Sequence, residues 1–237
     1  MPAGEVKVTA KKLKKRERNL KIAKRLVIII FVFLLVLFFI LSIVYKGGRF
    51  TVTLDPNFTL RSGIVLYENK DDIRYKNKLY ANEIEFMDNI SGDWIPANID
   101  SEKDGSHNGE NYIAYTFYVG NTGEEAINYW YRIKIMDVIK NVDEAIRIAV
   151  YQNGEKSVYA KESDLTGNEE PGTIKFYSDQ YAMLKERKHL GPKESDKYTV
   201  VIYLEGDDPE CVDAIIGGEL KLKMEIMEEH VENEKTK

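Results

Sequence analysis

YIAYTFYVGNTGEEAINYWYRIKI, residues 112–135, shows most clearly what kind of fold this chain adopts. Apolar and more polar side chains alternate along both halves of the stretch, and Asn121-Thr122-Gly123 interrupts them. A period of two is typical of a strand with one face in a core, while Asn and Gly favour a turn. We therefore predict two antiparallel strands, whose core positions are Ile113, Tyr115, Phe117 and Val119, then Ile127, Tyr129, Tyr131, Ile133 and Ile135.

The same alternation recurs on both sides of this pair. It predicts further strands at residues 50–54, 63–67, 146–151, 155–161, 173–177, 198–204 and 219–226. Asn153-Gly154 is typical of a two-residue hairpin turn, and Gly217-Gly218 precedes the last strand. Eight or nine strands in about 180 residues favour a mainly β domain, an antiparallel β-sandwich of the immunoglobulin-like or jelly-roll kind.

Residues 68–111 do not follow this pattern. They are rich in Asn, Asp, Gly and Lys, and their apolar runs are short. Because long structureless loops are uncommon inside compact domains, this stretch is either a functional insertion or a place where short strands escape the periodicity.

Residues 26–45, LVIIIFVFLLVLFFILSIVY, carry no charged side chain. A helix of this length spans roughly 30 Å, the thickness of the hydrocarbon core of a bilayer. A soluble helix would show a polar stripe, and this stretch has none. We predict a transmembrane helix in contact with the lipid bilayer.

The charges on either side of this helix predict its orientation. Residues 1–25 hold ten Lys and Arg and two acidic residues, a net charge of +8, whereas residues 46–237 carry a net charge of −13. The positive-inside rule therefore predicts a single-pass cell-membrane protein with a basic cytoplasmic tail at 1–25, an extracellular domain at 46–227 and a flexible acidic tail at 228–237. A signal peptide cleaved near Gly47 or Gly48 is the alternative, although the apolar run is longer than the apolar region of a usual signal peptide and lacks small residues at its end.

Composition and motifs exclude several classes of protein. One cysteine, Cys211, excludes a disulfide framework, and an acidic outer domain does not favour nucleic-acid binding. The three histidines are scattered, and the chain has no His-Glu-x-x-His, Gly-x-Ser-x-Gly, Ser-x-x-Lys, phosphate-binding loop or dinucleotide fingerprint. We therefore predict a protein that is not an enzyme and has no cofactor, with a bound calcium ion as the alternative.

Two acidic stretches are candidates for that ion. In the first, acidic and polar residues alternate before and after Gly105, which resembles the spacing of a calcium-binding loop: Asp100, Glu102, Asp104, Ser106 and Asn108. In the second, the carboxylates of Asp207, Asp208 and Glu210 crowd together within YLEGDDPEC. The alternative for both stretches is a solvated acidic loop.

Two single residues also stand out. Trp130 lies on the polar phase of its strand, where an exposed indole can stack on a sugar or anchor a protein partner, or can pack under a loop. Cys211 is an odd thiol, which either forms an intermolecular disulfide or packs as a small apolar side chain.

YTFYVGNTG at 115–123 and YLEGDDPEC at 203–211, followed by GGELKLKMEI at 217–226, together resemble the camelysin/TasA type of Gram-positive envelope and biofilm-matrix protein over about residues 112–228. The resemblance implies a cell-surface β-sandwich. Fibre-forming members lose their signal peptide, whereas this chain is predicted to keep its anchor.

These observations predict a membrane-anchored, non-catalytic surface protein that is structural or adhesive and self-assembles. If residues 112–119 and 198–204 lie at sheet edges, they could template strand pairing between copies. The alternative is a ligand-binding or accessory subunit that presents its sandwich to another envelope protein.

Overall fold

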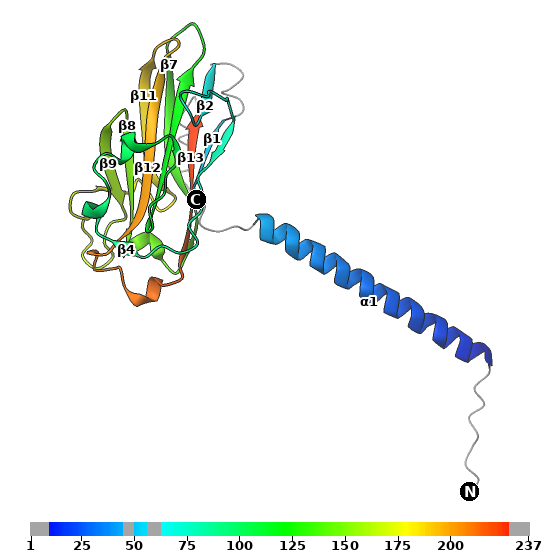
Figure 1. Cartoon of the computed structure of the whole chain (residues 1–237). Helices are drawn as coiled ribbons and strands as arrows, with labels where there is room; N and C mark the ends of the chain where they lie inside the picture. The colour runs from blue at the N-terminus through cyan, green and yellow to red at the C-terminus, as the bar shows by residue number, and fades with distance from the viewer. Residues whose placement is uncertain (1–9, 45–49, 56–62, 228–237) are drawn as a thin grey trace. The chain divides into compact units, whose positions relative to one another are not determined.

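A computed structural model describes residues 10–44, 50–55 and 63–227 (Figure 1). The chain divides into two compact units, residues 1–46 and residues 47–237. Each unit is described by itself below, and the predicted acidic tail at 228–237 lies outside the described residues.

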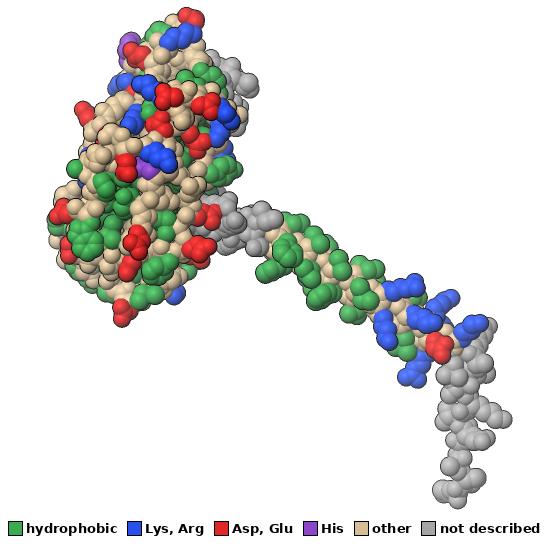
Figure 2. All heavy atoms as spheres, in the orientation of Figure 1, with side chains coloured by type: hydrophobic (Ala, Val, Ile, Leu, Met, Phe, Trp, Pro, Cys, Tyr) green, Lys and Arg blue, Asp and Glu red, His purple; other side chains and the backbone are tan. Residues whose placement is uncertain are grey.

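The first unit contains one helix, α1 (Ala10–Val44). Its segment Lys14–Ile40 is long and apolar enough to cross a membrane, which agrees with the predicted apolar helix. The helix begins well before Leu26, because the Lys, Arg and Leu residues of the basic stretch are good helix formers. Figure 2 shows the apolar side chains along one part of this helix and the basic side chains toward its N-terminal end.

The second unit is mainly β, as predicted, and its strands form two sheets. The first sheet has the order β11-β7-β13-β1-β3, with β1 (Phe50–Leu54), β3 (Lys78–Tyr80), β7 (Ile127–Ile139), β11 (Tyr181–Leu190) and β13 (Glu219–Met227). The second sheet has the order β10-β9-β8-β12-β6-β2, with β2 (Ile64–Tyr67), β6 (Tyr112–Asn121), β8 (Ile146–Gln152), β9 (Glu155–Ala160), β10 (Ile174–Lys175) and β12 (Ser195–Glu205). Two short strands join the second sheet, β4 (Asn89–Ile90) on β12 and β5 (Gly105–Ser106) on β6.

Both sheets are mixed, which corrects the expectation of a purely antiparallel domain. β1 runs parallel to β13, with Phe50 opposite Leu222, and the pairs β9–β10 and β4–β12 are also parallel. The remaining pairings between named strands are antiparallel, including β6–β12 and β7–β13. Alternation along one strand does not show the direction of its neighbour, so the sequence pattern left these three parallel contacts undetected.

One core is built from both sheets. The predicted core positions Tyr115, Phe117, Tyr129 and Ile133 are all buried in it, together with Phe50 of β1. A smaller buried cluster lies on the other face of the second sheet and consists of Ile90, Ile99, Ala114, Ala149, Tyr151, Val201 and Tyr203. The stretch 68–111 contributes Ile90 and Ile99 to this cluster and so helps to cover a face that the alternation assigned to solvent. The stretch contains β3, β4, β5, the 3₁₀ turn η1 (Gly92–Trp94) and the helix α3 (Ile99–Glu102).

The sequence analysis predicted one local feature of the second unit, a hairpin turn, and missed another, the strand β11. The hairpin between β8 and β9 turns through Asn153 and Gly154, whose φ angles are 52° and 91°, as the Asn-Gly pair predicts. In contrast, β11 escaped the sequence analysis altogether. Residues 185–189 of this strand read KERKH and show no apolar alternation, so the pattern did not predict a strand. An edge strand tolerates these charges because one of its sides has no strand neighbour among the described strands.

The strands proposed as templates for pairing between copies are interior. β12 lies between β8 and β6, and β6 lies between β12 and β2 with β5 alongside. The backbone at the start of β6 is bonded as well, because His107 N–H donates to Ala114 O at 2.9 Å and Gly109 N–H to Tyr112 O at 3.1 Å. The condition for edge pairing through residues 112–119 and 198–204 is therefore not met.

A polar network joins the two sheets inside the core. The hydroxyl of Tyr129 (β7) donates to Asp196 Oδ2 (β12) at 2.7 Å and lies 2.7 Å from the hydroxyl of Tyr198. The guanidinium of Arg187 (β11) donates to both oxygens of Asp196, from Nε at 2.8 Å and from Nη2 at 3.2 Å. Asn153 Nδ2 adds a further bond to Asp196 Oδ1 at 2.8 Å. Asp196 thus ties three strands and a hairpin together.

Candidate functional site

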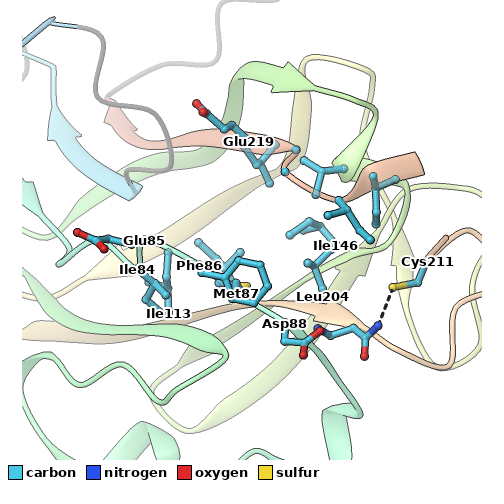
Figure 3. Close-up of a pocket in the computed structure, with 18 of the residues that line it drawn as sticks. Ile84, Glu85, Phe86, Met87, Asp88, Ile113, Ile146, Leu204, Cys211 and Glu219 are labelled. Carbon is cyan, nitrogen blue, oxygen red and sulfur yellow. Dashed lines mark hydrogen bonds between the residues drawn. The ribbon is translucent and has the colours of Figure 1, made fainter. Parts of the chain in front are cut away.

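A cavity of about 550 Å³ lies between the two sheets (Figure 3). The first sheet contributes Phe50 from β1 and Leu220 and Leu222 from β13. The second sheet faces them with apolar side chains of β6, β8 and β12, namely Ile113, Ile146, Ile202 and Leu204. The walls are therefore the edges of the hydrophobic core itself, and the cavity is suited to an apolar group.

Two irregular segments frame the cavity, residues 83–89 and residues 211–218. Ile84 and Met87 of the first segment are half-buried and pack against the core. Phe86 is 69% exposed, and across the cavity Val212 is 51% and Ile216 62% exposed. Isolated apolar side chains are common on protein surfaces. These three side chains, however, lie together at the border of one cavity, so they extend its apolar surface outward.

The charged side chains that line the cavity are acidic in the part of the chain that the structure describes. Five acidic residues belong to this lining, Glu83, Glu85, Asp88, Asp213 and Glu219, and no described Lys, Arg or His does. Lys140 contacts this lining from outside the cavity, and its Nζ donates to the carbonyl oxygen of Ile216 at 2.6 Å. An apolar space bordered by exposed carboxylates favours neutral or cationic ligands over anions.

Cys211 lines the same cavity and is half-buried (Figure 3). Asn89 Nδ2 lies 3.6 Å from its Sγ and donates to it, and neither of the described histidines, His107 and His189, lines the cavity to act as a base. Burial raises the pKa of the Cys211 thiol, and the nearby carboxylates of Asp208, Asp88 and Glu205 raise it further, whereas Asn89 lowers it. This environment favours the thiol over the thiolate.

We therefore expect Cys211 to react slowly with iodoacetamide at pH 8, since only the thiolate attacks. The control is the double variant C211A/A214C, which moves the one cysteine to an exposed neighbouring position. Mass spectrometry of timed samples should show slower alkylation of the wild-type chain, by about tenfold for each unit that separates the two pKa values. Equal rates would show that the thiol is not shielded.

The acidic residues of the first predicted calcium stretch, Asp100, Glu102 and Asp104, do not form a close group of carboxylates in the described part of the chain. Asp100 and Glu102 lie on α3, whereas Ser106 lies on β5. The side chains that follow are already used in protein hydrogen bonds: Asp104 accepts from Tyr118 Oη at 2.8 Å, Ser106 Oγ from Asn82 N–H at 2.8 Å, and Asn108 Oδ1 from Ala114 N–H at 3.0 Å. The contacts of Asp104 and Asn108 fasten stretch 68–111 to β6, and the contact of Ser106 lies within that stretch.

The second predicted stretch is partly brought together. Asp208 and Glu210 meet Glu170, and one carboxylate oxygen of each lies within 4.8 Å of the others, whereas Asp207 points to solvent. The guanidinium of Arg147 is already there, with Nη2 2.6 Å from Asp208 Oδ2 and 3.2 Å from Glu170 Oε2. Glu210 Oε2 is buried and has no hydrogen-bond partner among the described residues. Burial raises the pKa of Glu170, and Asp208 raises it further, while Arg147 lowers it.

The two tryptophans differ in exposure. Trp130 is half-buried on β7, between β11 and β13, and does not line the cavity; Glu186 and Met227 are its neighbours in the sheet. Trp94, at the end of η1, is 73% exposed. The sequence analysis passed over Trp94 because it lies in the stretch without a clear period.

Sequence reasoning also missed the cavity. Its walls come from positions between Phe50 and Leu222, and no local motif marks them. The one available signal was the pair of apolar runs outside the predicted strands, Ile84 to Met87 and Ile215-Ile216, because apolar side chains in irregular segments need a surface to contact.

No family model matches this chain, and no curated protein matches it. Among solved structures, a beta-glucosidase from Kluyveromyces marxianus in complex with glucose is similar at 10% identity and a TM-score of 0.27, covering 75% of this chain and 18% of that one. A second structure of that beta-glucosidase is similar at 14% identity and a TM-score of 0.25, covering 70% and 16%. The chain thus spans less than a fifth of these enzymes, and likenesses of this size support neither a shared fold nor a shared activity.

Proposed function

We propose that this protein is a membrane-anchored, non-catalytic binding protein of the cell surface, which holds an apolar side-chain group of a partner protein in the cavity between its sheets. The observation that carries the proposal is the apolar lining of that cavity, which continues onto the exposed side chains of Phe86, Val212 and Ile216. A partner that covers these groups removes apolar surface from water, which is the main favourable contribution to most protein association.

The sheet edges support a binding protein more than a self-assembling one. Three edge strands are short: β3 has three residues, β10 two and β2 four. The long edge strand β11 carries Lys185, Arg187 and Lys188, and its pairing with β7 contains two register shifts. Short, charged and irregular edges hinder pairing with a second copy.

The predicted topology belongs to the same proposal. The apolar part of α1 would cross the bilayer, and the basic residues before it would stay in the cytoplasm, which places the β domain outside. The domain would be a β-sandwich of immunoglobulin-like or jelly-roll kind, and a core shared by two sheets supports this. The similarity to the camelysin/TasA type and a role for calcium stay predictions.

The proposal is tested by filling the cavity. Leu220 is half-buried and lines the cavity, whereas Leu165 is 70% exposed and does not, so L220W and L165W form a matched pair. The probe is the neutral peptide acetyl-Ser-Leu-Phe-Leu-Ser-amide, titrated by calorimetry into the full chain in phosphatidylcholine nanodiscs. We expect peptide binding by the wild-type chain and by L165W to show a negative heat-capacity change. We expect L220W to bind the peptide at least about tenfold more weakly.

Empty nanodiscs provide the blank, and a thermal melt verifies that both variants fold. Absence of peptide binding to the wild-type chain, or equal binding by L220W and L165W, would overturn the proposal.

A further inference from the structure

The charge around the cavity indicates which chemical groups a partner can place at its border. This inference rests on the proposed function. Glu85, Asp88, Asp213 and Glu219 are exposed, line the cavity and form no ion pair within the part of the chain that the structure describes. Elsewhere on the domain, acidic and basic side chains pair repeatedly, as in Lys175–Glu162 at 2.7 Å and Lys193–Glu124 at 2.7 Å. The border of the cavity therefore carries several exposed carboxylates without a salt bridge next to an apolar surface, and Lys140 is the basic group that contacts its lining among the described residues.

Such a border selects by charge. Carboxylates beside a low-dielectric wall concentrate their field in the cavity mouth and attract cations from solution. An anionic ligand would be repelled by the same groups, and an uncharged one would gain only from the apolar contact. A ligand that places an apolar group in the cavity and a positive charge at its border uses both features.

The backbone of residues 84–87 indicates that the ligand is a peptide. Within the described residues, no hydrogen bond is formed by the N–H or C=O groups of Ile84, Glu85, Phe86 or Met87, although Asp88 N–H next to them donates to Asn111 Oδ1 at 3.0 Å. The side chains of these four residues line the cavity, so their backbone runs along it (Figure 3). A peptide satisfies such groups with its own main chain, as peptides do when they add to a sheet, whereas a lipid tail offers no partner.

We propose that the cavity binds a peptide segment of a partner protein in which apolar side chains are flanked by Lys or Arg. The apolar side chains enter between β13 and β12, the flanking ammonium or guanidinium groups face Glu85, Asp213 and Glu219, and the peptide backbone bonds to residues 84–87.

Cys211 supplies the readout, because it lines the cavity and is the one cysteine of the chain. Three acetylated and amidated peptides, Lys-Leu-Phe-Leu-Lys, Ser-Leu-Phe-Leu-Ser and Glu-Leu-Phe-Leu-Glu, are titrated against the full chain in phosphatidylcholine nanodiscs, and the rate of Cys211 alkylation by iodoacetamide is measured. At about 20 mM salt we expect the basic peptide to protect Cys211 at a concentration about tenfold lower than the acidic peptide, and the difference to shrink at about 0.5 M salt.

A matched pair of triple variants tests whether the carboxylates at the border of the cavity cause the preference for the basic peptide. E85Q/D213N/E219Q removes three carboxylates from the border and should abolish the preference, whereas E110Q/E155Q/D179N removes three exposed carboxylates that do not line the cavity and should keep it. All six positions are exposed, so both variants are expected to fold, and a thermal melt verifies this.

The outcomes separate the two proposals. Equal protection by the three peptides would overturn the basic preference and leave the apolar binding function standing. Protection by none of them would overturn both. Protection by dodecyltrimethylammonium below its micelle concentration, with no protection by the peptides, would overturn the peptide and identify a cationic lipid-like ligand instead.

Discussion

The variant D196A should lose about 3–5 kcal/mol of unfolding free energy, because a buried charge partner is removed while the groups it satisfied stay in place. Asp196 is 2% exposed and accepts from Tyr129, from Asn153 and twice from Arg187. Tyr129 is fully buried, so its hydroxyl would lose a strong acceptor away from water. Urea denaturation of the full chain in detergent micelles, followed by tryptophan fluorescence, measures the loss.

Two controls separate this network from a general effect of losing a carboxylate. D179A removes an exposed acidic side chain and should change stability by less than about 0.5 kcal/mol. D196N keeps one acceptor oxygen in place and should fall between the wild-type chain and D196A. A loss below about 1 kcal/mol for D196A would show that the bonds between the sheets contribute little to the domain's stability.

The variant R147M should be destabilised by a similar amount, about 3–5 kcal/mol at pH 8. Arg147 is buried, and its guanidinium is the cation that contacts Asp208, whose side chain is completely inaccessible to solvent, and Glu170. Methionine fills much of the same space but leaves these carboxylates without a positive partner. The combined variant R147M/E170Q/D208N removes the unpaired charges and should recover most of the lost stability.

The loss in R147M should depend on pH in a defined direction. The pKa of Glu170 is already raised above its usual value of 4.5, burial being the main cause, and removing Arg147 takes away the group that lowers it. A carboxyl whose pKa is higher in the folded than in the unfolded state binds more protons when folded, so its contribution to stability falls as pH rises above about 4.5. The difference between wild type and R147M should therefore be smaller at pH 5 than at pH 8. A difference that grows on acidification would contradict this account.

Several elements of the fold could be read from the sequence because each is a local property. An uninterrupted apolar run needs no tertiary partner to be recognised, and the helix around residues 26–44 is found where it was expected. Alternation along 112–119 and 127–135 placed Tyr115, Phe117, Tyr129 and Ile133 in the core correctly. The Asn153-Gly154 turn followed from backbone conformations that these two residues adopt at low cost.

Other elements escaped because their environment overrides their pattern. β11 carries KERKH in its middle and shows no apolar alternation, since it needs only one strand neighbour. Ala114 and Thr116 belong to the phase that alternation assigned to solvent, and they are buried because stretch 68–111 folds back over β6. The exposure of Trp94 and the partial burial of Trp130 could not be predicted from the pattern either, because exposure depends on what covers a side chain.

The sequence by itself determined the division of this protein into a basic segment, an apolar helix and an acidic β domain, because charge, hydropathy and period are properties of consecutive residues. Only the tertiary structure decided which distant residues meet. Phe50 lies opposite Leu222 in the first sheet, Arg147 reaches both Glu170 and Asp208, and residues 83–89 frame one cavity with residues 211–218. These contacts depend on how two sheets share one core, and the packing that selects them acts between residues that no local pattern connects.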